Sequence, residues 1–120
     1  MIAFEQLEKK IRELVAADPK NVYVSPGHGK TCSYVSGPCI NGSKGCIFGQ
    51  AILALRPDLR DSLIAFDLRE DTSIRYLLQD LGCNYTDKQV NWCQRLQNEQ
   101  DIQTGWANAL AAADIHNPLT

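Results

Sequence analysis

A glycine-rich stretch at residues 41–45 stands directly before an apolar segment that has the composition of a helix. The first backbone amides of a helix attract anions, and the helix dipole adds to that attraction. The glycines let the backbone approach a ligand, Ser43 supplies a hydroxyl and Lys44 supplies a positive charge. We therefore predict an anionic or nucleotide ligand here; the alternative is a solvated loop that leads into a helix. The predicted ligand-binding residues are His28, Lys30, Asn41, Gly42, Ser43, Lys44, Gly45 and Cys46.

Three of the five cysteines recur every seven residues, at Cys32, Cys39 and Cys46, and His28 precedes the first of them by four residues. Thiolates and imidazoles are ligands that zinc prefers, but zinc sites usually take their cysteines in close pairs. The spacing therefore disfavours a metal site, and we assign no metal ligand. A zinc-stabilised interaction module stays an alternative, because a folded loop can gather distant ligands.

Cys46 also stands at the predicted start of a helix, a position that favours the reactive thiolate form of a cysteine. A cysteine nucleophile needs a base nearby, and the two histidines of the sequence are His28 and His116. Nothing in the spacing places either histidine beside Cys46. We therefore predict no catalytic residue and interpret Cys46 as an apolar core thiol; the alternative is a cysteine-dependent enzyme that uses Cys46 and His28.

Length and composition indicate the class of protein. A chain of 120 residues with 44% hydrophobic and 22% charged side chains is typical of one globular domain, residues 1–120. The formal net charge of -2 gives no overall positive field that would recruit nucleic acid or an anionic membrane. No segment approaches the roughly 18 apolar residues that span a bilayer, and the first residues lack the pattern of a secretion signal. We therefore expect a cytoplasmic protein with reduced cysteines and no cofactor.

Apolar residues spaced three and four apart predict that most of the chain is helical. The first helix is expected at residues 2–17, and a central helix that is apolar on nearly all sides is expected at residues 46–55. Pro57 ends this second helix and begins a short one. Gly45 and Gly49 lie four apart, so they allow a neighbouring element to come close to the second helix.

The second half of the chain carries clear helix-end signals. Asp71 and Thr72 are the candidate N-caps of a helix at residues 73–81, which Gly82 ends. Thr86 is followed three residues later by a glutamine, which is the pattern of a capping box at the start of another helix. These signals predict two helices joined by a short connection.

Two tryptophans stand in the last third of the chain. Trp92 lies on a face of its helix separate from that of Cys93, and residues 104–105 either break or kink the helical stretch before Trp106. Because a tryptophan anchors protein interfaces well, we predict Trp92 and Trp106 as interface residues of a homo-oligomer. Packing within the monomer is the alternative.

Two short segments rich in β-branched residues, 21–24 and 31–35, flank a cluster of turn-forming residues at 25–30. This pattern predicts a β-hairpin with a loop longer than the tight two-residue type. An isolated hairpin is marginally stable in water, so it must pack against helices or against another chain. The predicted fold class is therefore α+β: a mostly helical single domain with about five helices and one short β-hairpin.

Several short motifs occur in order along the chain. They are Tyr23, Cys32-Ser33-Tyr34, Gly45-Cys46-Ile47-Phe48-Gly49, and Gln100-Asp101 followed by Trp106. With these motifs the chain resembles small uncharacterised proteins of actinobacteria and their phages, whose pattern is C-x-Y, then G-C-x-x-G, then Q-D-x-G-x-x-W. Gln103 departs from that pattern, because it stands where the pattern has a glycine. The resemblance implies a phage or mobile-element accessory protein and assigns no catalytic residue.

Together these observations favour a small, non-enzymatic cytoplasmic binding protein. The expected partner is a host protein or a small anionic or nucleotide ligand. Nucleic acid and membranes are not expected as partners, because the chain has no excess of positive charge.

Overall fold

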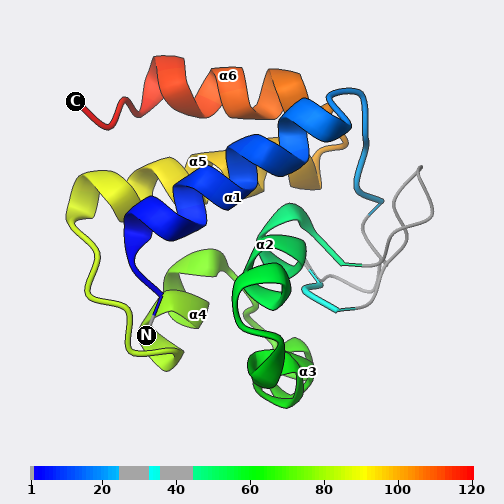
Figure 1. The fold of residues 1–120 in the computed structure, drawn as a ribbon, viewed down its shortest axis with the longest axis vertical. Helices are drawn as coiled ribbons and strands as arrows, with labels where there is room; N and C mark the ends of the chain where they lie inside the picture. The colour runs from blue at the N-terminus through cyan, green and yellow to red at the C-terminus, as the bar shows by residue number, and fades with distance from the viewer. Residues whose placement is uncertain (1, 25–32, 36–44) are drawn as a thin grey trace.

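The computed structural model describes residues 2–24, 33–35 and 45–120. Most of these residues belong to six α-helices. The helices are α1 (Phe4–Ala17), α2 (Ile47–Leu55), α3 (Arg60–Asp67), α4 (Ile74–Asp80), α5 (Asp87–Asp101) and α6 (Trp106–His116), and a 3-10 turn, η1 (Pro57–Leu59), precedes α3. In Figure 1, α1, α5 and α6 lie side by side in one half of the molecule, and α2, α3 and α4 lie in the other.

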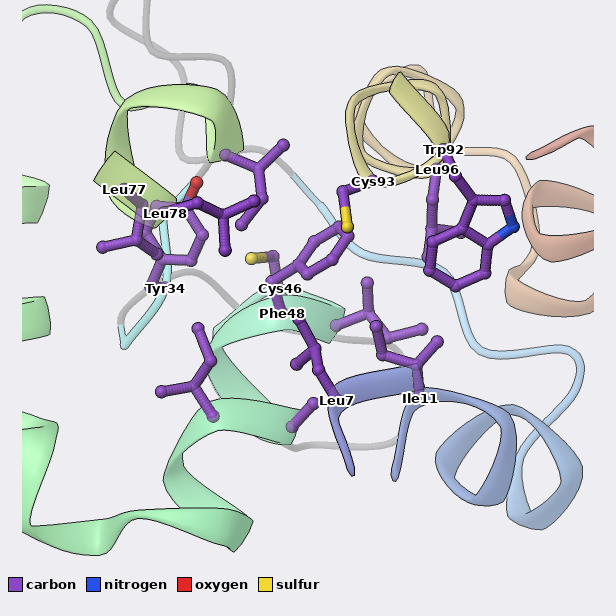
Figure 2. Packing of buried hydrophobic residues seen from close by; sticks show 14 of the residues in the cluster. Leu7, Ile11, Tyr34, Cys46, Phe48, Leu77, Leu78, Trp92, Cys93 and Leu96 are labelled. Atoms are coloured by element: carbon purple, nitrogen blue, oxygen red, sulfur yellow. The ribbon is translucent and has the colours of Figure 1, made fainter. Parts of the chain in front are cut away.

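The helices bury the apolar positions that the sequence spacing indicates. Phe4, Leu7, Ile11 and Val15 form the buried stripe of α1, which confirms the amphipathic helix expected there. One hydrophobic cluster draws side chains from all six helices, and Figure 2 shows Phe48 of α2 near its centre. No helix formed by the described residues is both long enough and apolar enough to cross a membrane.

The predicted β-hairpin is wrong, and with it the α+β class, because the described part of the chain contains helices and no strand. The proposed turn at residues 25–30 lies outside the described residues. Other partners satisfy the backbone groups that a strand ladder would use. The Ser33 amide donates to the Tyr23 hydroxyl at 2.8 Å, and the Ser33 carbonyl accepts from the Cys46 amide at 2.9 Å. The Tyr23 side chain and the backbone at Cys46 therefore take the place of a neighbouring strand at Ser33.

The close approach predicted at Gly45 and Gly49 is confirmed. A Cβ atom at either glycine would overlap the backbone carbonyl of Tyr34, which crosses the start of α2. Gly45 also has a φ of 88°, a left-handed conformation that favours glycine. The two glycines therefore fix the segment at residues 33–35 directly against α2.

The helix ends agree with the sequence signals in most places. The Thr86 hydroxyl accepts from the Gln89 amide at 3.2 Å, which confirms the capping box of α5. Gly82, with a φ of 73°, follows the end of α4. The predicted N-caps Asp71 and Thr72 are wrong, because Ser73 occupies that position and has no side-chain cap bond of its own. The predicted break before α6 is real, and Gln103 takes a φ of 64° there.

Candidate functional site

Most of the predicted ligand loop lies outside the described residues, namely His28, Lys30, Asn41, Gly42, Ser43 and Lys44. Gly45 and Cys46 are described, and both are buried. Two amides at the start of α2 already have protein partners, because Cys46 donates to the Ser33 carbonyl and Ile47 donates to Gln100 Oε1 at 3.2 Å. These two amides therefore serve the fold, and they are not available to an anion.

Cys46 lies inside the hydrophobic cluster with no exposed surface (Figure 2). This placement agrees with an apolar core thiol and gives no route for a substrate to the sulfur. Cys83 and Cys93 are also free thiols, and burial raises the pKa of Cys93. Among the described residues no group of three or more His, Cys, Asp or Glu is arranged to hold a metal ion. His28, Cys32 and Cys39, which the zinc alternative requires, are outside that part of the chain.

The two predicted interface residues are used inside the chain. Trp92 has no exposed surface and Trp106 is 1% exposed. The Trp92 ring packs edge-on against Phe4 of α1, with ring centroids 5.7 Å apart. The helix faces that carry these rings are therefore covered by the monomer itself, and neither ring is offered to a second protomer.

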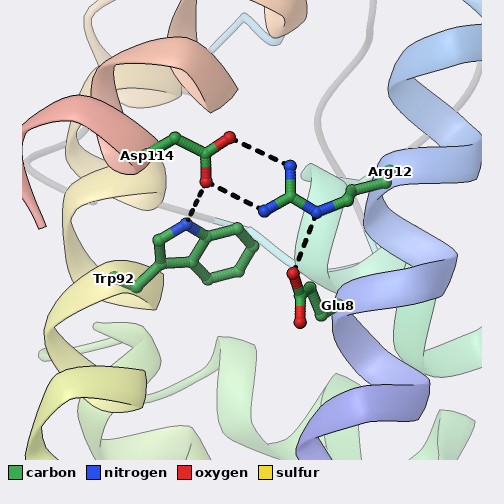
Figure 3. Close-up of polar contacts among 4 residues, drawn as sticks. All are labelled: Glu8, Arg12, Trp92 and Asp114. Atoms are coloured by element: carbon green, nitrogen blue, oxygen red, sulfur yellow. Dashed lines mark hydrogen bonds and ion pairs between the residues drawn. The ribbon is translucent and has the colours of Figure 1, made fainter. Parts of the chain in front are cut away.

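The outer edge of Trp92 belongs to a polar contact that joins three helices (Figure 3). Arg12 of α1 donates through both terminal nitrogens to the Asp114 carboxylate of α6, at 2.9 Å each. Its Nε donates to Glu8 at 2.9 Å, and the Trp92 indole donates to Asp114 at 3.0 Å. Arg12 holds the pKa of Asp114 below its ordinary value. We call Glu8, Arg12, Trp92 and Asp114 the Arg12 clamp.

A second polar group lies in the interior and fixes residues 33–35. The buried carboxylate of Asp67, at the end of α3, accepts from the Tyr34 amide at 2.8 Å and the Val35 amide at 3.1 Å. It also accepts from the Ser33 hydroxyl at 3.2 Å. Three donors on consecutive residues stabilise a carboxylate away from water. Asp67 therefore anchors this segment where the sequence predicts a strand.

Two buried glutamines of α5 cap other helices. Gln97 Oε1 accepts from the amide of Ile74, the first residue of α4, at 2.7 Å. Gln100 Oε1 accepts from Ile47, the first residue of α2. Gln97 also donates to the Tyr34 hydroxyl at 2.7 Å. Since the first amides of a helix have no partner within it, these side chains hold the starts of α2 and α4 against α5.

The position of α4 creates a polar groove between α4 and α5, of about 270 Å³. Arg75 follows the capped residue Ile74 directly, and its guanidinium donates to Asn91 Oδ1 of α5 at 3.0 Å. Arg95 enters the groove from α5. We call this the arginine groove; its lining residues are Arg75, Asn91, Gln94, Arg95, Asn98 and Asn117.

A smaller groove of about 210 Å³ adjoins the first and shares two residues with it, Asn91 and Asn117. We call it the lysine groove; its lining residues are Lys88, Asn91, His116, Asn117 and Pro118. Among the described residues that line either groove, none is Asp or Glu. The grooves therefore form a locally basic surface on a chain whose formal net charge is -2.

Nearby carboxylates compensate this charge only in part. Arg95 lies 3.6 Å from Glu99, one turn further along α5. Lys88 also borders a separate groove that contains Glu5 and Glu8, but within the described chain Lys88 forms no ion pair, and neither does Arg75. Among the described residues, Glu99 is thus the one carboxylate that forms an ion pair with either guanidinium group of the arginine groove.

Asp101, the last residue of α5, is a carboxylate that forms no ion pair with the residues the structure describes. Its side chain is half-buried and accepts a hydrogen bond from Gln100 at 2.9 Å. Burial raises the pKa of Asp101 to about 7, although the hydrogen bond opposes the rise. Asp101 does not line either basic groove.

Sequence reasoning missed the grooves, although part of the signal is visible. Lys88, Asn91, Arg95 and Asn98 are spaced three, four and three apart, so they share one face of α5 without an acid among them. Arg75 and Asn117 come from other elements, and only the packing brings them to that face.

Comparison with protein-family models, with curated proteins and with solved structures finds no match to this chain. The resemblance to small actinobacterial and phage proteins therefore stays a prediction from the sequence pattern.

Proposed function

We propose that the protein is a non-enzymatic binding protein that holds a small anionic ligand in the arginine groove. One observation carries the proposal: guanidinium groups from two helices, Arg75 and Arg95, line a groove that has no carboxylate among its described lining residues. Guanidinium groups bind phosphate and carboxylate oxygens through paired, charge-assisted hydrogen bonds. The ligand class is the one predicted from the sequence, but the site is a different one.

The amide side chains of the groove support this assignment. Gln94 donates to Asn98 Oδ1 at 2.9 Å and to the buried Gln97 at 3.2 Å, so its orientation is set by the protein. Arg75 is held in a similar way by Asn91. Side chains that are already oriented lose less conformational freedom when a ligand binds. A groove of about 270 Å³ fits a small anion or the charged end of a larger molecule.

The groove offers donors and positive charge, with no cysteine, serine or carboxylate among its described lining residues to act as nucleophile or base. This composition favours binding over catalysis.

The test is thermal unfolding with added inorganic phosphate and with a panel of nucleotides at low ionic strength. A ligand that binds only the folded chain raises the melting temperature, and added sodium chloride weakens the effect. We expect Arg75→Gln to remove most of the rise. Arg60→Gln is the matched control, because Arg60 is exposed on α3 and lines neither groove.

A second variant separates this site from the predicted loop. If Lys44→Ala removes the rise and Arg75→Gln keeps it, the ligand binds at the loop and our placement is wrong. If phosphate and the whole nucleotide panel leave the melting temperature of the unsubstituted protein unchanged, the proposed function is wrong.

A further inference from the structure

The arginine groove and the lysine groove follow one another along α5. Lys88 and Arg95 are seven residues apart, so they lie on the same face and about 10 Å apart along the helix axis. Asn91 stands between them and lines both grooves, as does Asn117 beyond the end of α6. Two basic centres are therefore separated by a wall of amide side chains, with no acidic residue in the described lining of either groove.

The orientation of Asn91 links the two centres. Its Oδ1 accepts from Arg75, so the carbonyl side of the amide faces the arginine groove. An amide presents its two N–H donors from the other atom, Nδ2, and within the described chain no hydrogen bond occupies these donors. The side chain that orients Arg75 thus offers two further donors to a ligand that crosses from one groove to the other.

The lysine groove adds a different kind of positive group. Lys88 comes from the first turn of α5 and His116 from the last turn of α6, so two helices contribute to it, as two helices contribute to the arginine groove. A lysine ammonium is a compact charge that binds phosphate without fixed geometry, whereas a guanidinium binds it in a defined plane. The two grooves together therefore suit a ligand with one phosphate held in a fixed orientation and a second phosphate held more loosely.

We propose that the two grooves are two subsites for one ligand that carries two phosphate groups about 10 Å apart, one held by Arg75 and Arg95 and the other by Lys88 and His116. This inference rests on the proposed function, since it assigns a ligand class to the same surface. Phosphate is favoured over carboxylate because each groove offers more donors than the two oxygens of a carboxylate can accept.

The test uses two probes of equal charge, hexane-1,6-diol bisphosphate and ethane-1,2-diol bisphosphate, in calorimetric titrations of the full chain. The six-carbon spacer reaches both grooves, and the two-carbon spacer confines both phosphates to one. The unsubstituted protein is expected to bind the longer compound at least about tenfold more tightly, because the second phosphate binds as part of the same molecule. Lys88→Gln and His116→Gln are each expected to reduce this preference and to leave the affinity for the shorter compound unchanged.

Two control variants complete the design. Arg75→Gln is expected to weaken the binding of both compounds, and Lys20→Gln, an exposed lysine outside both grooves, is expected to weaken neither. Equal affinities for the two compounds, or a Lys88→Gln variant that weakens both alike, would overturn the two-subsite inference while the proposed function stands. If neither compound nor inorganic phosphate binds, the proposed function fails as well.

Discussion

Arg12 is partly exposed and Arg75 is exposed, and the two arginines differ in what surrounds them. Arg12 donates to two carboxylates, Asp114 and Glu8, and its guanidinium carbon lies 5.6 Å from the centre of the Trp92 ring. Arg75 donates to the neutral amide of Asn91 and forms no ion pair with the described residues. Asp114 and Glu8 neutralise the charge of Arg12, whereas no described carboxylate pairs with the charge of Arg75.

This difference separates a stabilising arginine from a binding one. A guanidinium paired on two sides keeps helices together and has little left to offer a ligand. A guanidinium positioned by an amide keeps its full charge and most of its donors. The sequence does not show which arginine stabilises the fold and which is available for binding, because both lie on amphipathic helices. The side chains that each arginine meets on the neighbouring helices determine its role.

The largest loss of stability is expected at Gln97, because this side chain positions α4 and with it the arginine groove. Gln97→Leu leaves the buried Ile74 amide without its acceptor and the Tyr34 hydroxyl without one donor. We expect the free energy of unfolding to fall by about 2–3 kcal/mol, and the phosphate response to weaken, while the Arg12 clamp keeps its contacts. Urea denaturation measures the loss. Gln79→Leu, at an exposed position of α4, is the control and should change stability little.

Asp101 extends the comparison to carboxylates, because Asp114 pairs with Arg12 whereas Asp101 forms no ion pair within the described chain. Its folded pKa of about 7 lies above the ordinary value of 3.8, so between these values the folded chain holds a proton that the unfolded chain releases. Stability therefore falls as the pH rises through this window. Asp101→Asn should remove this slope and raise the free energy of unfolding at pH 7 by about 2 kcal/mol, which is half of the roughly 4 kcal/mol that the full pKa difference implies, because solvent reaches the half-buried side chain. Urea midpoints measured at intervals from pH 4 to pH 7.5 test it. A slope that persists in the variant would assign it to another group.

The Arg12 clamp can be broken directly. Asp114→Ala removes the acceptors of the two terminal nitrogens of Arg12 and the acceptor of the Trp92 indole, and it leaves the hydrogen bond from Arg12 Nε to Glu8 in place. Because both ion-pair partners are 39% exposed, solvent limits the expected loss to about 1–2 kcal/mol. The phosphate response should stay unchanged. Folding lowers the pKa of Asp114. The stability that Asp114 contributes is therefore fully present above the ordinary pKa of an aspartate, and it is lost as the pH falls through the lowered pKa. This pH dependence has the opposite sign to that of Asp101. A reduced phosphate response in this variant would contradict the separation of the two arginines.

Arg75→Gln should have the smallest effect on folding. Arg75 is exposed, and the one hydrogen bond that it forms with the described residues, to Asn91, lies at the surface. We expect the free energy of unfolding to change by less than about 0.5 kcal/mol in thermal or urea denaturation. A loss as large as that of Asp114→Ala would show that Arg75 stabilises the fold as Arg12 does.

From the sequence, residues of the candidate site could be grouped only where they lie on the same helix. The stripe of Lys88, Asn91, Arg95 and Asn98 follows from helical spacing alone. Arg75 joins that stripe because Gln97 caps α4 from a distant part of the chain, and no local pattern encodes such a contact. Our sequence-based site was placed at the start of α2, where the structure shows Cys46 and Ile47 donating to protein acceptors.

The sequence by itself determined the local features of this protein. Apolar spacing fixed the buried stripe of α1, Thr86 and Gln89 fixed the start of α5, and Gly45 and Gly49 marked a close approach before its partner was known. Such features depend on side chains a few residues apart or on the conformational range of one residue. Composition alone led to the wrong β-hairpin at residues 21–24 and 31–35, because the amides of residues 33–35 donate to side chains distant in the sequence, which composition does not reveal.

Only the tertiary structure decided which polar groups are consumed by the fold and which remain for a ligand. Asp67 and Gln97 bind backbone donors more than twenty residues away, and Arg12 meets Asp114 from the far end of the chain. Within the described part of the chain, Arg75 forms no ion pair with a carboxylate in the same packing. A charge is neutralised by what lies beside it in space, and for residues distant in the sequence that neighbour is set by helix packing.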